Sequence, residues 1–218
     1  MPAATIDELT IADDAERWEQ LGFETSGDWL QLGRVRLRMA GAKAGRGILG
    51  WSLREVSSTE LDGLPTSLSQ APVPEPAGLH PNGVVAIDHV VAMSPELDRS
   101  VRALQAAGLD LRRVREEPTP AGAPRQAFFR LGAEILELIQ EPEQVVATAG
   151  GPDHPARFWG LALSAEDLEG AAERLGPDLG EVRPAVQAGR LIATLRRSAG
   201  LAVPVALMSV GAGAVQAR

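Results

Sequence analysis

Residues 82–142 alternate between apolar and polar positions in short runs, and one helical stripe interrupts the alternation. Three apolar residues recur at the spacing of an amphipathic helix: Leu97, Val101 and Leu104. The runs on either side have the period of two that is typical of half-buried strands. The pattern predicts strand, helix, strand, strand, strand, with the helix over residues 95–107 and Ser94 as its N-cap.

Two polar side chains stand in the apolar strands of this segment. His89 lies in the first predicted strand and Glu137 in the last, and each shares its face with aliphatic residues. A polar group on an apolar face is costly unless it has a partner. We therefore expect each of the two to contact either a metal ion or the other.

The same order of elements occurs before and after this segment, and a stretch rich in Pro and Ser separates the first copy from the second. Its lack of periodicity is typical of a linker. The predicted parts are a degenerate module (1–57), the linker (58–82), a central module (83–145) and a further module (155–211), with helices near 13–21, 95–107 and 165–175.

The segments IDHVVAMSPELDRSVRALQAAGL (87–109) and RQAFFRLGAEILELIQEP (125–142) resemble the vicinal oxygen chelate superfamily. That superfamily includes glyoxalase I, bleomycin-resistance proteins, extradiol dioxygenases and epimerases. The resemblance implies an α+β glyoxalase-like fold, in which repeated βαβββ modules pair and enclose a pocket. It also implies that the first and last strands of a module are neighbours and that each offers one metal ligand. His89 and Glu137 fall on those positions, so a divalent ion such as Zn, Ni or Mn is an expected cofactor.

The other two modules depart from this ligand pattern. The aligned position holds Glu8 in the first module and Gly160 in the third, whose last strand has no carboxylate. We expect the central module to pair with the third, whereas Glu8 completes the site only if the first module faces it. A non-haem iron oxygenase uses two histidines and a carboxylate, so an extradiol dioxygenase is not expected.

Three further residues are candidates for contact with a ligand. Gln126 and Phe128 share a face of the third strand in the central module, and Phe158 opens the first strand of the third module. The alternative is that Phe128 and its neighbour Phe129 both belong to the core and Gln126 to a rim. His80 and His154 lie beside Pro in loops, and we expect both to be exposed.

Composition narrows the class of protein. The 218 residues are 44% hydrophobic, carry a net charge of −8 and include no Cys, which excludes thiol catalysis and Cys-based zinc sites. Basic residues form no patch, so nucleic acid is not an expected partner. No signal peptide and no apolar run of membrane-spanning length are recognisable, which favours a cytoplasmic protein. The odd number of modules suggests a homodimer.

Three functional hypotheses remain. In the first, His89 and Glu137 hold a divalent ion in a lyase or isomerase that acts on a small molecule with vicinal oxygens, and Glu137 moves a proton. In the second, no metal binds, the two residues form a hydrogen-bonded pair, and the protein sequesters a small molecule as bleomycin-resistance proteins do. In the third, the modules serve only dimerisation.

Overall fold

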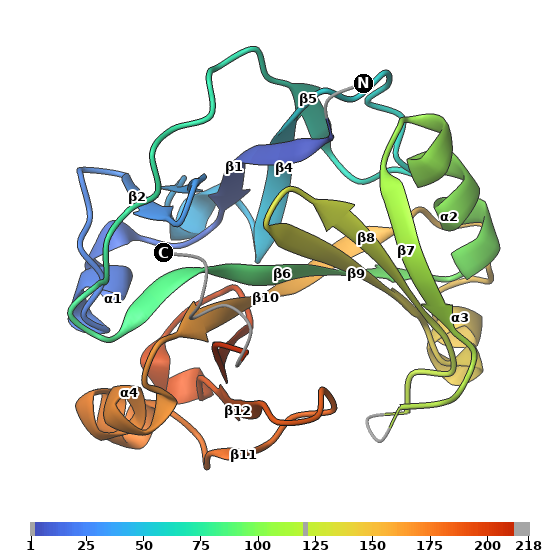
Figure 1. Ribbon diagram of the computed structural model, residues 1–218. Coiled ribbons are helices and arrows are strands. Elements are labelled where there is room, and N and C mark those ends of the chain that lie inside the picture. The colour runs from blue at the N-terminus through green and yellow to red at the C-terminus, as the bar shows by residue number, and fades with distance from the viewer. Residues whose placement is uncertain (1–2, 120–121, 212–218) are drawn as a thin grey trace. The chain divides into compact units, whose positions relative to one another are not determined.

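The computed structural model describes residues 3–119 and 122–211 (Figure 1). Its strands form two sheets, one of five and one of eight strands, and both contain parallel and antiparallel pairs. Short helices accompany the sheets. The chain therefore has an α+β fold, as the resemblance implies.

The order strand, helix, strand, strand, strand runs three times through the described residues. The first set is β1 (Thr5–Ile11), α1 (Ala15–Gln20), β2 (Trp29–Leu32), β3 (Val35–Met39) and β4 (Ile48–Arg54). The second is β6 (Val84–Ser94), α2 (Leu97–Ala106), β7 (Asp110–Arg115), β8 (Gln126–Leu131) and β9 (Glu134–Gln140). The third is β10 (Arg157–Ala165), α4 (Leu168–Leu175), β11 (Arg183–Pro184), β12 (Leu191–Thr194) and β13 (Val205–Ser209). Between the sets lie β5 (Thr66–Leu68) and α3 (Glu143–Thr148).

The described residues divide into two compact units, each made of three chain segments. The first unit holds the segments up to Leu9, Leu49–Pro72 and His89–Trp159. The second unit holds Thr10–Ile48, Val73–Asp88 and the chain from Gly160 onward. Among the described residues no helix is long and apolar enough to cross a membrane.

In the first unit, the pattern of burial separates the two faces of the sheet formed by β7, β8, β9 and β6. β6 pairs with β9 in parallel, and β8 pairs antiparallel with both β9 and β7. One face is fully buried and apolar, and α2, which lies beside β7 in Figure 1, contributes to the same core. This core contains Val90, Ala92, Leu97, Leu104, Ala127, Phe129, Leu136 and Leu138. The opposite face is only half-buried and carries His89 and Glu137.

The start of α2 differs from the prediction. Ser94 is the last residue of β6, so its assignment as the N-cap was wrong. The N-cap is Glu96, whose carboxylate accepts a hydrogen bond from the backbone N–H of Arg99 at 2.6 Å. Because a carboxylate at this position satisfies an otherwise unpaired N–H and favours the helix dipole, it stabilises the first turn.

The second unit contains a similar combination of strands and helix. β10 pairs with β13 in parallel, and β12 lies antiparallel to β13. α4 begins after Asp167, whose side chain accepts from the backbone N–H of Gly170 at 2.9 Å. The start of each of these two helices is thus fixed by an acidic side chain three residues before the N–H that it accepts from.

His80 is buried in the second unit, so the prediction of an exposed turn histidine was wrong. Only 5% of the residue is accessible, and its ring lies edge-on to Phe23 with centroids 5.3 Å apart. The backbone N–H of Glu24 donates to Nδ1 at 3.1 Å, which leaves Nε2 to donate to the carbonyl of Gln31 at 3.0 Å. The Pro and Gly residues around His80 suggested an exposed turn, whereas both ring nitrogens of this histidine make hydrogen bonds inside the protein.

Candidate functional site

The centre of the candidate site is a direct contact between His89 and Glu137. Their strands, β6 and β9, are paired neighbours, and Nε2 of His89 lies 3.2 Å from Oε2 of Glu137. The side chains are 14% and 16% exposed, so the pair is largely withdrawn from water but still reachable. Alternation along each strand placed both residues on one face, and the parallel pairing brings them together.

Gln126 completes a polar trio with this pair. It lies on β8, and its Nε2 donates a hydrogen bond to Oε1 of Glu137. The residue is only 7% exposed, and its Oε1 is a buried atom without a hydrogen-bond partner among the described residues. A buried amide oxygen that lacks a partner is energetically costly, which marks this position as one where a further group would be stabilising.

The surroundings of the trio are apolar. Phe128 stands directly opposite Glu137 in the pairing of β8 with β9, and its side chain is half-buried. On β6 and β9, the neighbouring positions of this face are half-buried aliphatic residues and a methionine: Val91, Met93, Ile135 and Ile139. Phe158 has a different contact, because its ring packs edge-on to Trp51 of β4 with centroids 5.1 Å apart. The trio is therefore a small polar cluster with apolar neighbours on a partly accessible sheet face.

The donor set of the trio is compatible with a divalent ion, though it is small. Two ligand atoms bound to one ion at about 2.1 Å each are separated by a distance like that between His89 and Glu137. The buried Oε1 of Gln126 is a third possible ligand, and carboxylate and amide oxygens suit hard ions such as Mn²⁺. In the part of the chain that the structure describes, no group of three or more His, Cys, Asp or Glu side chains could hold a metal.

A second polar cluster lies at the end of β9, and the sequence pattern did not indicate it. Glu141 is 1% exposed, and its Oε1 accepts from Nε and Nη2 of Arg157 at 3.0 and 2.9 Å. Nε2 of His154 lies 3.4 Å from the other carboxylate oxygen, and His154 is half-buried rather than exposed as predicted. The Arg157 guanidinium therefore neutralises Glu141, whereas Oε2 of Glu141 and Nε2 of His154 are buried atoms without a hydrogen-bond partner among the described residues.

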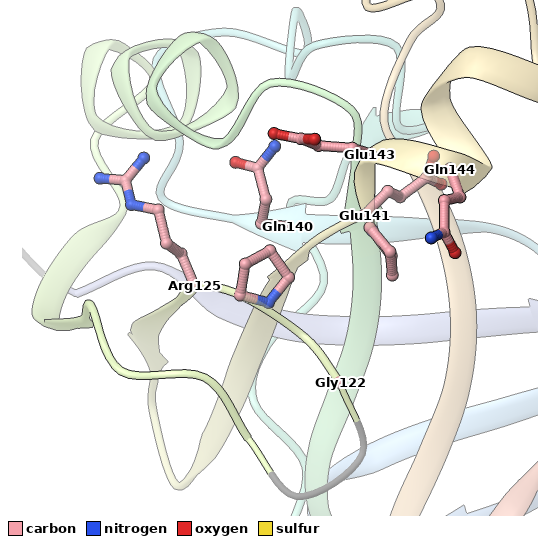
Figure 2. A pocket seen from close by; sticks show the side chains of 8 residues that line it. Gly122, Arg125, Gln140, Glu141, Glu143 and Gln144 are labelled. Atoms are coloured by element: carbon pink, nitrogen blue, oxygen red, sulfur yellow. The ribbon is translucent and has the colours of Figure 1, made fainter.

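A pocket of about 550 Å³ opens beside this end of the sheet (Figure 2). Arg125 and Gln140 line it, and in Figure 2 their side chains point to the same side. Arg125 donates to both Asp98 and Glu116, and these hydrogen bonds lower the pKa of each carboxyl below its ordinary value. No member of the trio lines this pocket, so we do not assign the site to it.

Comparison with known proteins addresses the fold. No family model and no curated protein sequence matches the chain. Methylmalonyl-CoA epimerase from Mycobacterium tuberculosis matches with a TM-score of 0.50 and 20% identity, over 64% of this chain and 97% of the epimerase. A fusion protein of a xylose isomerase-like TIM barrel and 4-hydroxyphenylpyruvate dioxygenase matches with a TM-score of 0.62 and 14% identity. That match covers 99% of this chain and 51% of the fusion protein, so the chain spans about half of that relative.

The chain has the glyoxalase-like fold. Both matched structures belong to the vicinal oxygen chelate superfamily, and the larger match extends along nearly the whole chain. The fold that the resemblance implied is therefore confirmed. At 14% and 20% identity the matches carry the fold alone, and the chemistry of this glyoxalase-like protein has to be argued from its own residues.

Proposed function

We propose that this glyoxalase-like protein is an enzyme, a divalent-metal-dependent lyase or isomerase that acts on a small molecule with vicinal oxygens. The observation that carries the proposal is the polar trio. His89 Nε2 and Glu137 Oε2 lie 3.2 Å apart, and the buried, unpartnered oxygen of Gln126 belongs to the same group.

In this proposal each residue of the face has a role. His89 and Glu137 would hold the ion, with the amide oxygen of Gln126 as a further ligand once the amide is turned. When bound, a divalent ion polarises substrate oxygens. The Glu137 carboxylate accepts a proton from the carbon beside the polarised oxygen and returns it. Phe128 offers an apolar wall opposite Glu137.

The second candidate function is metal-free binding of a small molecule, and a specific contact favours it. Both oxygens of Glu137 already face protein groups, Nε2 of Gln126 on one side and Nε2 of His89 on the other. A carboxylate held in this way needs no metal to be stable on an apolar face. The trio then serves as a hydrogen-bonding anchor for the ligand.

Metal content and thermal stability separate the two functions. Wild type, His89→Ala and Glu137→Ala are purified, their metal content is measured, and thermal unfolding is followed with Zn²⁺, Ni²⁺ or Mn²⁺ added. We expect one ion to raise the unfolding temperature of the wild type, since a ligand at one hundred times its Kd stabilises by about 2.7 kcal/mol. Both substitutions should abolish the increase.

The control is Glu143→Ala, which removes an exposed carboxylate from α3 and should leave the response to the ion unchanged. A wild type that carries no metal and gains no stability from any of the three ions would contradict the enzyme proposal. That result would leave metal-free binding as the better account of the trio.

A further inference from the structure

Arginines occupy the same sheet face as the trio. In the pairing of β7 with β8, Arg115 stands opposite Gln126, and Arg113 opposite Phe128. Phe128 in turn stands opposite Glu137 on β9. Because directly opposite residues of an antiparallel pair share a face, a row runs across three strands from Arg113 to the carboxylate.

A third arginine extends the row along β8. Arg130 is directly opposite Ile135 on β9, and it also faces Asp110 on β7. The carboxylate of Asp110 pairs with Arg112 at 3.1 Å rather than with Arg130. The outer edge of this face therefore carries an excess of positive charge, although the whole chain has a net charge of −8.

These arginines are available to a ligand. Arg113 and Arg130 are exposed, and within the described ranges neither makes an ion pair or a side-chain hydrogen bond. Arg115 has Glu117 at 3.7 Å, but the Glu117 side chain is 74% exposed, and such surface pairs are weak. An oxyanion that binds here displaces water rather than a protein partner.

We infer that the ligand of this site is an anionic small molecule whose carboxylate or phosphate group binds Arg113 and Arg130 while its reactive part lies over Phe128 at Glu137. The inference rests on the proposed function, because it names the ligand class of that site. Neighbouring strands lie about 4.8 Å apart, so β7 is roughly 10 Å from β9. The ligand therefore places its anionic group about that far from the atoms that contact Glu137. The planar fork of arginine suits both kinds of oxyanion.

Calorimetric titration of the full chain with two simple anions tests the inference. Inorganic pyrophosphate represents the phosphate class and malonate the carboxylate class, and sodium chloride at matched ionic strength is the reference. The buffer contains no divalent ion, so the result is independent of metal binding. We expect at least one anion to bind the wild type more tightly than chloride does, and the arm that binds identifies the class.

The double variant R113Q/R130Q should weaken this binding by about tenfold or more, because it removes the charged donors that bind the oxyanion. The control R102Q removes an arginine that is 72% exposed on α2, and it should bind as the wild type does. If the double variant fails to fold, R113Q and R130Q alone give the same comparison. The inference is overturned if neither anion binds beyond the chloride reference, or if the arginine variants bind like the wild type. A failure of the proposed function would be seen in a separate experiment, in which the metal ions would not raise the unfolding temperature of the wild type.

Discussion

The strand pair β6 and β9 of the central module differs from the pair β10 and β13 of the third module at the two positions that matter for the site. Both pairs are parallel, and both first strands lead to a helix capped by an acidic residue. His89 precedes its N-cap, Glu96, by as many residues as Gly160 precedes Asp167. In the pairing, Val91 lies beside Glu137, whereas the corresponding Ala162 lies beside Ala206. The third module thus has glycine and alanine where the central module has imidazole and carboxylate.

The difference at Gly160 is enforced by the backbone. A Cβ atom built on Gly160 would lie 2.6 Å from the carbonyl oxygen of Pro204, closer than real Cβ atoms come to any atom. That same carbonyl accepts a hydrogen bond from the N–H of Leu161 at 2.9 Å, so it cannot easily move. The close approach of these two segments therefore excludes a ligand side chain, in line with the notion that glycine marks a close backbone contact.

The largest loss of stability is expected from placing a side chain at the contact between Gly160 and Pro204. Gly160→Ala forces Pro204 and β13 to shift, and overpacking of this kind costs about 1–3 kcal/mol. Thermal unfolding should show a midpoint lowered by several degrees. Gly78→Ala is the control, because a Cβ there meets no atom within 4 Å. If Gly160→Ala were as stable as the wild type, backbone packing would not explain the missing ligand.

A smaller loss of stability is expected when the side chain that caps α2 or α4 is removed, and it should be similar in both modules. Glu96→Ala and Asp167→Ala each remove the acceptor for an N–H in the first turn, which costs about 0.5–2 kcal/mol. Denaturant unfolding measures both losses. Asp167→Asn keeps an acceptor at the same place and should lose little. A loss at one cap but none at the other would show that the two helix starts are less alike than their geometry indicates.

The smallest effect concerns the dependence of stability on pH in the first unit. Hydrogen bonds from Arg125 lower the pKa of Asp98 and of Glu116 relative to 3.8 and 4.5. Because the folded state binds these protons less tightly, the stabilisation is complete above the unfolded pKa values and is lost as pH falls below them. The difference in unfolding temperature between wild type and Arg125→Gln should therefore shrink from pH 6 to pH 3. The change is small, since both carboxylates are largely exposed.

In the second unit, the pKa of one carboxyl group is shifted in the opposite direction, upward. Asp13 is 2% exposed, and burial raises its pKa above 3.8. Its folded form retains the proton to higher pH than the unfolded chain does, so this group makes the protein less stable as pH rises above 3.8. The pH profile of the Arg125→Gln variant, which still has Asp13, should show this trend more clearly than the wild type. A profile identical to that of the wild type would contradict the assignment to Arg125, and a profile that rises with pH in the variant would contradict the assignment to Asp13.

Features that depend on local periodicity could be predicted from the sequence. Alternation with a period of two placed each of His89 and Glu137 on the same face as its aliphatic neighbours, and the resemblance supplied the adjacency of the two strands. The contact between Gln126 and Glu137 depends on the register of β8 against β9, which no local pattern specifies. The arginine row depends also on the register shift between Leu111 and Arg113 in β7.

Other features were outside the reach of local patterns. α3 is only six residues long, and its N-cap, Pro142, makes no side-chain hydrogen bond, so neither periodicity nor a capping side chain marks this helix in the sequence. His80 is buried because Phe23, more than fifty residues away in sequence, packs against its ring. Loop composition predicts exposure only where no distant element covers the loop.

The hydrogen bonds of the Pro- and Ser-rich segment have a consequence for proteolysis. Upstream of Val73, Arg54 donates to the carbonyls of Ala71 and Pro72. Downstream, Arg34 donates to the carbonyl of Pro74. Val73 lies between these anchors and is 50% exposed, but the hydrogen bonds on both sides hold its backbone in place. Because a protease needs backbone that can leave its place, this stretch should resist limited digestion despite its exposure, and Arg54→Gln or Arg34→Gln should make it easier to cut.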